Sequence, residues 1–279
     1  MKAVVVEVLG DAEAEIAWRR FGKGDRTDTS RVTVSPLVTI KSRLVSQANV
    51  EAFTVTITVS LYAGYPWFTD WGRDTMISLE GLLLTTGRHD LARQVLQGFG
   101  AHLRDGLLPN LFPEGESAGL YHTADATLWY FHALDRYLAH TGDTSLLVEL
   151  WPGLMDSLGK HLARQAPFGI GVDPRDGLLT QGQEGFQLTW MDAKVDGDVI
   201  TPRRGKAVEL NALWHRALTL GSTWAASMGG TTVASQLGRA AERVRASFVE
   251  RFVHPVTGGL RDVVDGEDPL DAERIRCNQ

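Results

Sequence analysis

From residue 74 onward, apolar residues recur at the spacing of an α-helix, and glycines interrupt the pattern at intervals. The run 74–87 ends at Gly87, and the run 128–138, with apolar residues every three or four positions, is followed by Gly142. A further run steps by four residues through Leu91, Val95, Phe99 and Leu103. An apolar stripe at this period is typical of an amphipathic helix, and glycine commonly ends one. The pattern therefore predicts helices that follow one another as hairpins.

The helical pattern continues through the C-terminal half. Asp143 can cap the helix that follows it, and Pro152 can occupy the first turn of another helix. The segment 207–229 precedes a run in which one face is formed by Val233, Leu237, Ala241, Val244 and Phe248. Two long segments between helical runs, 104–122 and 167–205, are rich in glycine, proline and charge, and long ordered loops are often functional.

Residues 1–61 differ from the rest because they are rich in β-branched residues that partly alternate with polar ones. Strands are predicted for KAVVVEVL, RVTVSPLVTI and AFTVTITVSL, with the polar GKGDRTDTS between the first two. We therefore expect a mainly α protein in which a β-rich segment, residues 1–61, precedes a helical region, residues 62–279. Strands are expected only in the first of these two parts.

Composition excludes several classes of partner. The 279 residues include 28 basic and 34 acidic ones, so the net charge of −6 offers no basic field to nucleic acid or an anionic membrane. No apolar run approaches the roughly 20 residues that a membrane-spanning helix needs. The single Cys277 excludes an intramolecular disulfide framework, and Asp11 and Glu13 precede any signal-peptide core. We expect a cytoplasmic protein with a neutral partner, no nucleic acid and no membrane.

Sequence motifs for metal, phosphate and covalent chemistry are absent. The eight histidines form no HExxH pair, and the segment 192–203 resembles a calcium loop but has Lys194 at its third position and Arg203 at its twelfth. No Walker sequence occurs, and GIGVDPRDG lacks the third glycine of a dinucleotide fingerprint. There is no Gly-x-Ser-x-Gly elbow. We therefore expect neither a metal nor a cofactor.

Carboxylates beside tryptophans remain as material for chemistry: Asp70, Asp74, Asp125, Glu184, Asp192, Asp196 and Glu209. Glycoside hydrolysis needs one carboxylic acid to protonate the leaving oxygen and a second carboxylate to activate water or attack the anomeric carbon. The chain has eight tryptophans against five tyrosines, and flat rings stack on the apolar faces of sugars. Because these clusters lie at loop-to-helix junctions, hairpins that present them at one end would form a single pocket there.

Plainer interpretations compete with a sugar site for individual residues. Helix capping or loop solvation is the favoured interpretation of Asp176, Asp196 and Asp198. Core packing is an equal alternative for each tryptophan.

Four segments carry a resemblance to a known family: AGYPWFTDWGRDTMISLEGLLLTTGR, YHTADATLWYFHAL, LTWMDAKVDGDVITPRRGKAVELNALWHRAL and the terminal RIRCNQ. They are similar to the glucosidase domain of glycogen debranching enzymes, the amylo-alpha-1,6-glucosidase family, over about residues 62–279. The resemblance implies an (α/α)6 toroid, related to glucoamylases, whose loops at one end enclose the non-reducing glucose. It also implies inverting hydrolysis of the α-1,6-linked glucose at a branch point of glycogen or a branched α-glucan.

The resemblance also implies roles for individual residues. Asp192 stands where the family has its general acid, and the ring of Trp190 would help to keep its carboxyl protonated. Arg73 and Asp74 would hydrogen-bond the hydroxyls of the terminal glucose. The other implied pocket residues are Trp71, Asp125 and Trp129, which form its walls, together with Lys194, Arg203 and Glu209.

The family's catalytic base, a glutamate, follows the segment that RIRCNQ resembles, and the late glutamates Glu250, Glu267 and Glu273 lie in no matching motif. We therefore expect this chain to lack the base, to form an incomplete toroid and to be almost inactive by itself. A glucoamylase- or trehalase-type hydrolase is an alternative, because an Arg-Asp pair at a helix start would suit any glucose-ending substrate. A non-catalytic glucan-binding module is the other alternative.

Overall fold

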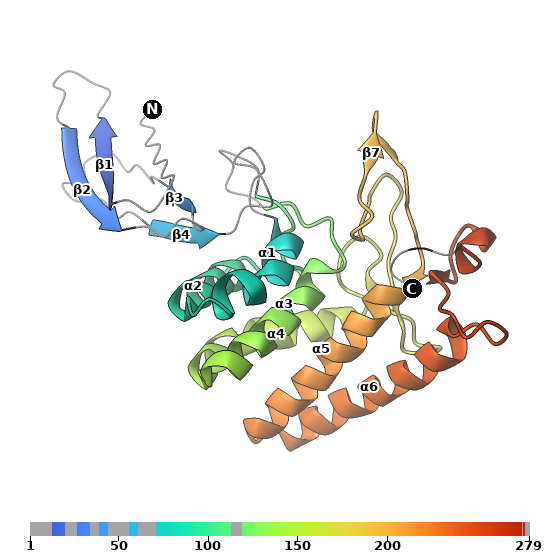
Figure 1. Cartoon of the computed structure of the whole chain (residues 1–279). Coiled ribbons are helices and arrows are strands. Elements are labelled where there is room, and N and C mark those ends of the chain that lie inside the picture. The colour runs from blue at the N-terminus through green and yellow to red at the C-terminus, as the bar shows by residue number, and fades with distance from the viewer. Residues whose placement is uncertain are drawn as a thin grey trace.

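The structure is a computed structural model, and it describes residues 13–19, 27–33, 39–43, 56–60, 71–112, 119–274 and 276. The regular structure of this part is mainly helical, as predicted (Figure 1). Its helices are α1 (Gly72–Leu79), which continues into the π-helical η1 (Glu80–Leu84), α2 (His89–Gly100), α3 (Ala126–Thr141), α4 (Thr144–Leu162), α5 (Val208–Ser227), α6 (Thr231–Phe252) and the short 3₁₀ helix η2 (Pro269–Ala272).

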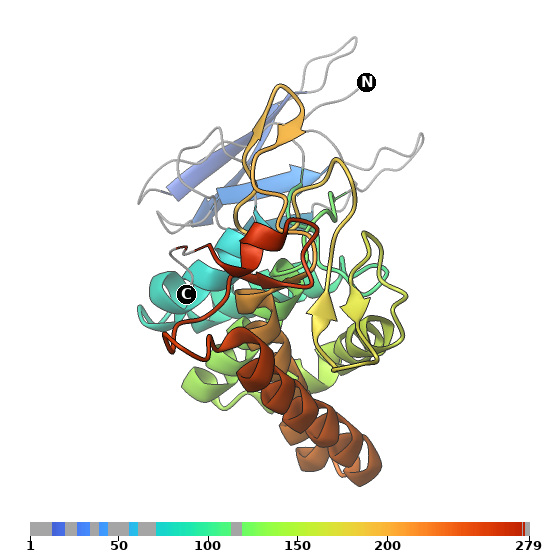
Figure 2. The same cartoon turned by 90° about the vertical axis from the view of Figure 1, so that its right-hand side faces the viewer.

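Successive helices form hairpins whose members alternate between two rows. In the first row, α3 packs between α1 and α5 (Figure 1). In the second row, α2 packs against α4, and α6 runs along α5 (Figure 2). The long loops that connect the hairpins gather at the upper end of the helices in Figure 1. The loops that carry the charged and aromatic clusters of the sequence therefore lie together at one end of the helices.

The core is built from apolar side chains of both rows. Complete burial is found for Leu83, Leu96, Phe131, Leu154 and Trp214, which come from five different helices. On α6, the stripe predicted from the sequence buries Leu237, Ala241 and Val244. Removal of these surfaces from water is the main force that holds the hairpins together. None of the described helices is both long enough and apolar enough to cross a membrane.

The predicted caps between α3 and α4 are confirmed. Gly142 has a φ of +69° and donates its N–H to the carbonyl of Leu138, which ends α3. Glycine adopts this left-handed conformation without a steric penalty. The side chain of Asp143 then accepts a hydrogen bond from the backbone N–H of Ser145 and caps α4. The turn therefore forms because its local sequence favours it at both positions.

Pro152 does not begin a helix, and that prediction is wrong. It lies inside α4, where it removes the hydrogen bond to the carbonyl of Val148. Val148 is 61% exposed, so this carbonyl lies on the solvent side of the helix. Leu150 and Leu154 on either side of the proline are buried. Packing of this apolar face keeps α4 continuous through the proline.

Short strands also occur beyond residue 61, so the expectation that strands are confined to the N-terminal segment is wrong. They form three antiparallel pairs: β5 (Gly171–Val172) with β6 (Leu179–Thr180), β7 (Lys194–Val195) with β8 (Asp198–Val199), and β9 (Lys206–Ala207) with β10 (Val263–Val264). The turn residues of the β7–β8 hairpin, Asp196 and Gly197, have φ values of 51° and 95°, as a two-residue type I′ turn requires. These pairs satisfy backbone groups in loops that would otherwise have no regular partners.

Two further strand pairs lie in the N-terminal segment. β1 (Glu13–Arg19) pairs with β2 (Thr27–Thr33), and β3 (Thr39–Arg43) pairs with β4 (Thr56–Ser60), both antiparallel. The polar stretch expected to connect two strands, residues 22–30, instead contributes the first half of β2. The apolar run 31–40 is divided between β2 and β3. The strand predicted at residues 2–8 lies outside the described residues.

Candidate functional site

The start of α1 is held by the loop that precedes α3. The N–H of Gly72 donates to the carbonyl of Asn110 at 2.9 Å, and the N–H of Arg73 donates to the Oδ1 of Asn110 at 3.1 Å. The two backbones approach so closely that a Cβ on Gly72 would lie 2.2 Å from the carbonyl oxygen of Pro109. Trp71, the residue before α1, forms a β-bridge with Leu111. The direction in which Arg73 leaves the helix is therefore fixed by this loop.

Arg73 joins two carboxylates that come from distant parts of the chain. Its Nε lies 2.7 Å from Oδ2 of Asp125, at the start of α3, and its Nη1 lies 2.8 Å from Oδ2 of Asp192. The hydroxyl of Thr123 donates to the other oxygen of Asp125 at 2.8 Å. Burial alone would lower the pKa of Arg73, but the two carboxylates outweigh it and raise this pKa. Three of the residues predicted for the site are thus in direct contact.

Asp192 reaches Arg73 because the loop before it is fastened to α3. The N–H of Ala124 donates to the carbonyl of Leu188 at 2.8 Å, and Leu188 is buried in the core. Thr189 is also buried, and its hydroxyl accepts the N–H of Met191 at 3.3 Å. The side chain of Asp192 remains 34% exposed, whereas that of Asp125 is 1% exposed. Of the two carboxylates on Arg73, Asp192 is therefore the one that a ligand can reach.

Asp74 adds a third carboxylate at the edge of this group. It is an exposed residue in the first turn of α1. Partial loss of hydration raises the pKa of Asp74, and the nearby charges of Asp192 and Asp125 raise it further, while Arg73 opposes them. These influences place Asp74 within electrostatic range of the other three residues.

His122 is a member of the site that the sequence analysis did not single out. Burial lowers the pKa of His122, the charges of Lys194 and Arg73 lower it further, and Asp192 opposes them. The imidazole lies beside the ring of Phe186, with ring centroids 6.3 Å apart. His122 precedes Thr123 in the segment YHTADATLWYFHAL, so the sequence already places it near Asp125. Only the fold places it near Asp192 and Lys194.

The predicted tryptophans and Lys194 belong to the segments that carry this group, and they differ in exposure. Trp190, two residues before Asp192, is 39% exposed. Trp129 lies one turn after Asp125 on α3, is half-buried, and meets the ring of His132 edge-on. Lys194 is exposed on β7 and donates to the carbonyl of Gly185 at 3.0 Å. Asp70, a further candidate, lies outside the described residues.

Arg203 and Glu209 form a second cluster with Asp262. Both terminal nitrogens of Arg203 donate to the carboxylate of Glu209 at 2.6 Å, and Nη2 also lies 2.7 Å from Oδ1 of Asp262. The side chain of Arg203 is completely buried, while that of Glu209, in the first turn of α5, is 18% exposed. Only Glu209 of the predicted pair can therefore meet a ligand directly. Asp262 is absent from the residues that the sequence singled out.

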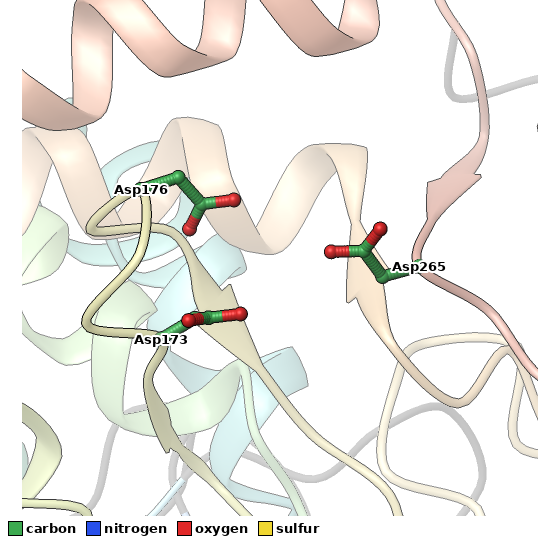
Figure 3. Close-up of side chains that lie close together, drawn as sticks. All are labelled: Asp173, Asp176 and Asp265. Atoms are coloured by element: carbon green, nitrogen blue, oxygen red, sulfur yellow. The ribbon is translucent and has the colours of Figure 1, made fainter.

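A third charged cluster surrounds the ammonium group of Lys206. The carboxylates of Asp173, Asp176 and Asp265 turn toward one another (Figure 3), with oxygens within 4.8 Å. The Nζ of Lys206 lies 2.8, 2.6 and 2.7 Å from these three side chains in turn. Burial would lower the pKa of Lys206, but the carboxylates raise it. The cluster therefore contains its own cation in the place that a metal ion would take.

Asp176 also serves the loop, as the sequence suggests. Its Oδ1 accepts the N–H of Leu178 at 3.0 Å. However, its Oδ2 binds Lys206 and also pairs with Arg251. Asp176 is thus a largely buried ion-pair partner as well as a loop cap, whereas Asp196 lies exposed in the β7–β8 turn.

The group around Arg73 has the chemistry of a site for polyhydroxylated ligands. A fixed guanidinium supplies hydrogen-bond donors, and Asp74 and Asp192 supply acceptors. A carboxyl group such as that of Asp192 can also act as a general acid and donate a proton to a leaving oxygen. Trp190, two residues before Asp192 in the chain, has exposed indole surface on which a sugar ring can stack.

Comparisons with known proteins point to a glycosidase. A family model described as amylo-alpha-1,6-glucosidase matches residues 39–279. The glycogen debranching enzyme of Saccharomyces cerevisiae is 27% identical over 206 residues, which is 64% of this chain and 13% of the yeast protein.

Among solved structures, a rhamnosidase from Klebsiella oxytoca with rhamnose bound is similar with a TM-score of 0.53 and 18% identity. The match covers 74% of this chain and 37% of the rhamnosidase. At this identity the likeness concerns the fold, and the helical hairpins are arranged as in part of that glycosidase. The chain thus spans a minor part of the length of both proteins.

Proposed function

Since the chain belongs to the amylo-alpha-1,6-glucosidase family, we propose that it acts on glycogen or a related branched α-glucan. The proposed reaction is hydrolysis of the α-1,6-linked glucose at a branch point, with inversion. The observation that supports it most is that Arg73 binds both Asp125 and Asp192 across 52 and 119 residues of sequence. These residues come from the segments in which the family resemblance is found.

The same proposal covers the architecture. The alternation of α1, α3 and α5 with α2, α4 and α6 in two rows is what an (α/α)6 toroid requires of its inner and outer helices. The pocket would then lie where the first row meets the loops. There, Arg73 and Asp74 bind the hydroxyls of the terminal glucose, and Trp71, Trp129 and Trp190 border it. Asp125 holds Arg73 from behind, and Lys194 and Glu209 provide charge at the rim.

Asp192 is the proposed general acid because it is the carboxylate on Arg73 that a substrate can reach. In the structure, Oδ2 of Asp192 is bound to Arg73, whereas a general acid has to reach the glycosidic oxygen. We therefore place a glucose hydroxyl on Nη1 of Arg73 in the complex, in the position that Asp192 occupies without a ligand. Freed from Arg73 in this way, Asp192 can turn to the leaving oxygen and give it a proton.

The ion pair also suits a second function, binding of the glucan without catalysis. If Asp192 stays bound to Arg73, it accepts hydrogen bonds from hydroxyls but gives no proton to a glycosidic oxygen. Hydrolysis and simple binding therefore make different predictions for the same residue.

The test compares an isomaltosyl-branched limit dextrin with a linear α-1,4 dextrin, for the protein and its Asp192→Asn variant. In a full-length context we expect glucose from the branched substrate, a loss of about 10²- to 10⁴-fold in rate in the variant, and unchanged retention on glycogen, whereas the 279-residue chain by itself should release almost none. Asp156→Asn, at an exposed ion pair on α4, is the control and should change neither. Retention without any glucose release would support the binding function. Preference for the linear dextrin would contradict the proposed linkage.

A further inference from the structure

Arg203 is held between two carboxylates by a pair of hydrogen bonds on each side. Its Nη1 and Nη2 donate to Oε1 and Oε2 of Glu209 at 2.6 Å each. Its Nε and Nη2 donate to Oδ2 and Oδ1 of Asp262 at 3.0 and 2.7 Å. Bidentate pairs of this kind fix direction as well as distance, because the guanidinium and both carboxylates are planar. The position of the Glu209 carboxylate therefore depends on Asp262 through Arg203.

Burial decides which of these three side chains can meet a ligand. The side chains of Arg203 and Asp262 have no exposed surface, and that of Glu209 is 18% exposed. Arg276 pairs with Asp262 from the other side and is 17% exposed. Arg276 also lies 3.3 Å from Asp271, so each buried charge of this network has an opposite charge beside it, which is the condition under which buried ions are tolerated.

The backbone of Arg203 is arranged to aim its side chain at this place. Its φ is +43°, in a left-handed region that residues other than glycine rarely adopt. Its carbonyl accepts a hydrogen bond from Nε2 of Gln181 at 2.6 Å. Residues persist in this conformation only where the surroundings enforce it. Here the two carboxylates and Gln181 provide that enforcement.

Asp262 also holds the backbone beside Glu209. The carbonyl of Asp262 accepts the N–H of Val208, the first residue of α5, at 3.0 Å. Glu209 is the next residue along the helix. Asp262 thus has two effects. Its main chain fixes the start of α5, and its side chain fixes the carboxylate of Glu209 through Arg203.

We propose that Asp262 is a positioning residue for sugar recognition that acts through Arg203 on Glu209. The proposal rests on the function proposed above, in which Glu209 faces the glucan. The two bonds to Arg203 fix the plane of the Glu209 carboxylate, so its exposed part meets a sugar hydroxyl in a fixed direction. Arg203 does not touch the sugar but orients the group that does.

The test is a double-mutant cycle on binding of isomaltose, measured by isothermal titration calorimetry. Glu209→Gln and Asp262→Asn should each weaken binding by about 10- to 100-fold, as expected for a lost or misdirected hydrogen bond to a charged group. The double variant should bind no more weakly than Glu209→Gln alone, because Asp262 acts through Glu209. Asp173→Asn, at the buried Lys206 cluster, should lower the melting temperature and leave the affinity unchanged.

A further variant separates positioning from stability. Asp262→Asn removes the carboxylate that Arg203 and Arg276 share and leaves each arginine with one partner, Glu209 and Asp271, so it should also lower the melting temperature. Adding Arg276→Gln removes one of the two cations and should recover part of the stability without recovering affinity.

Three results would overturn the positioning role: wild-type affinity in Asp262→Asn, additive losses in the cycle, or affinity that returns with Arg276→Gln. If Glu209→Gln binds isomaltose as the wild type does, the proposed function fails at Glu209, and the positioning role fails with it.

Discussion

Nη1 of Arg73 lies 2.8 Å from Oδ2 of Asp192, although 119 residues separate the two in the chain. On the other side of the same guanidinium, Nε lies 2.7 Å from Oδ2 of Asp125. The side chain of Asp125 is 1% exposed, and that of Asp192 is 34% exposed. One cation thus joins a buried carboxylate to one that solvent reaches, so the contribution of each contact to stability should differ.

Replacement of Arg73 should destabilise the protein far more than replacement of Asp192. Arg73→Met leaves Asp125 buried without its counter-ion, which should lower the free energy of unfolding by about 3–5 kcal/mol. Asp192→Asn removes a partly exposed partner and should change it by less than about 1 kcal/mol. Urea unfolding of both variants measures the difference. Equal losses would show that leaving Asp125 buried without Arg73 costs no stability, which would contradict this account.

Lys206 should contribute strongly to the stability of the protein, because it is a buried cation among three carboxylates. Lys206→Met leaves Asp173, Asp176 and Asp265 close together with less positive charge, and we expect a loss of about 3–5 kcal/mol in the free energy of unfolding. Lys160→Met, which removes a partly exposed ion pair on α4, is the matched control and should lose less than about 1 kcal/mol.

The Lys206→Met variant offers a second measurement. Three carboxylates with oxygens within 4.8 Å of one another resemble the ligands of Ca²⁺, so added Ca²⁺ should raise the melting temperature of this variant. The wild type should not respond, because the ammonium of Lys206 fills the space. A wild type that is stabilised as strongly as the variant would contradict this account of the cluster.

The helices could be predicted from the sequence because their signals are local. The apolar stripe of α6 and the turn between α3 and α4 depend on residues within a few positions of one another. Pro152 was misjudged because its preference for a first turn is also local, whereas the burial of Leu150 and Leu154 depends on the other helices. The β7–β8 hairpin had an Asp-Gly turn signal at Asp196, but strands of two residues carry no periodicity.

The candidate site could be predicted only in part. The resemblance to the family supplied Arg73 and Asp192, and the structure shows that they are in contact. His122 was missed although it lies in one of the family-like segments, because only the fold places it near Asp192, and Asp262 was missed because nothing in its immediate sequence marks it. Asp262 meets Arg203 across 59 residues of sequence, so its importance arises from the pairing of β9 with β10, which the sequence did not reveal.

Acid should destabilise the protein in a window set by the Lys206 cluster. Hydrogen bonds from Arg251, helped by Lys206, lower the pKa of Asp265 to about 2. The Arg175 side chain, with Lys206, lowers the pKa of Asp173 further. The unfolded value is about 3.9, so the folded state binds fewer protons, and its advantage is complete above about pH 4 and is lost as the pH falls toward 2.

Melting temperatures between pH 5 and pH 2 measure this effect. Asp265→Asn should show a smaller decrease than the wild type across the window, because one of the titrating groups is gone. Asp198→Asn, at an exposed residue of the β7–β8 hairpin, should follow the wild-type curve. Parallel curves for wild type and Asp265→Asn would show that this carboxylate contributes nothing to acid sensitivity.

Gly72→Ala should disturb stability and ligand binding together. The new Cβ would lie 2.2 Å from the carbonyl oxygen of Pro109, a backbone atom that no rotamer change can move away. The start of α1 must then shift, and it carries the hydrogen bond from the N–H of Arg73 to Asn110. Overpacking of this kind lowers stability by about 1–3 kcal/mol, and a displaced Arg73 should weaken the binding of isomaltose.

Gly81→Ala is the matched control for this prediction. Gly81 lies further along the same helical segment, in η1, and a Cβ there meets nothing within 4 Å. Alanine is favoured over glycine in a helix by up to about 1 kcal/mol, so stability should be equal or higher and the affinity for isomaltose unchanged. If Gly72→Ala behaves like Gly81→Ala in both measurements, α1 can shift at its start without moving Arg73. The close contact with the loop at Pro109 would then have no part in positioning the guanidinium.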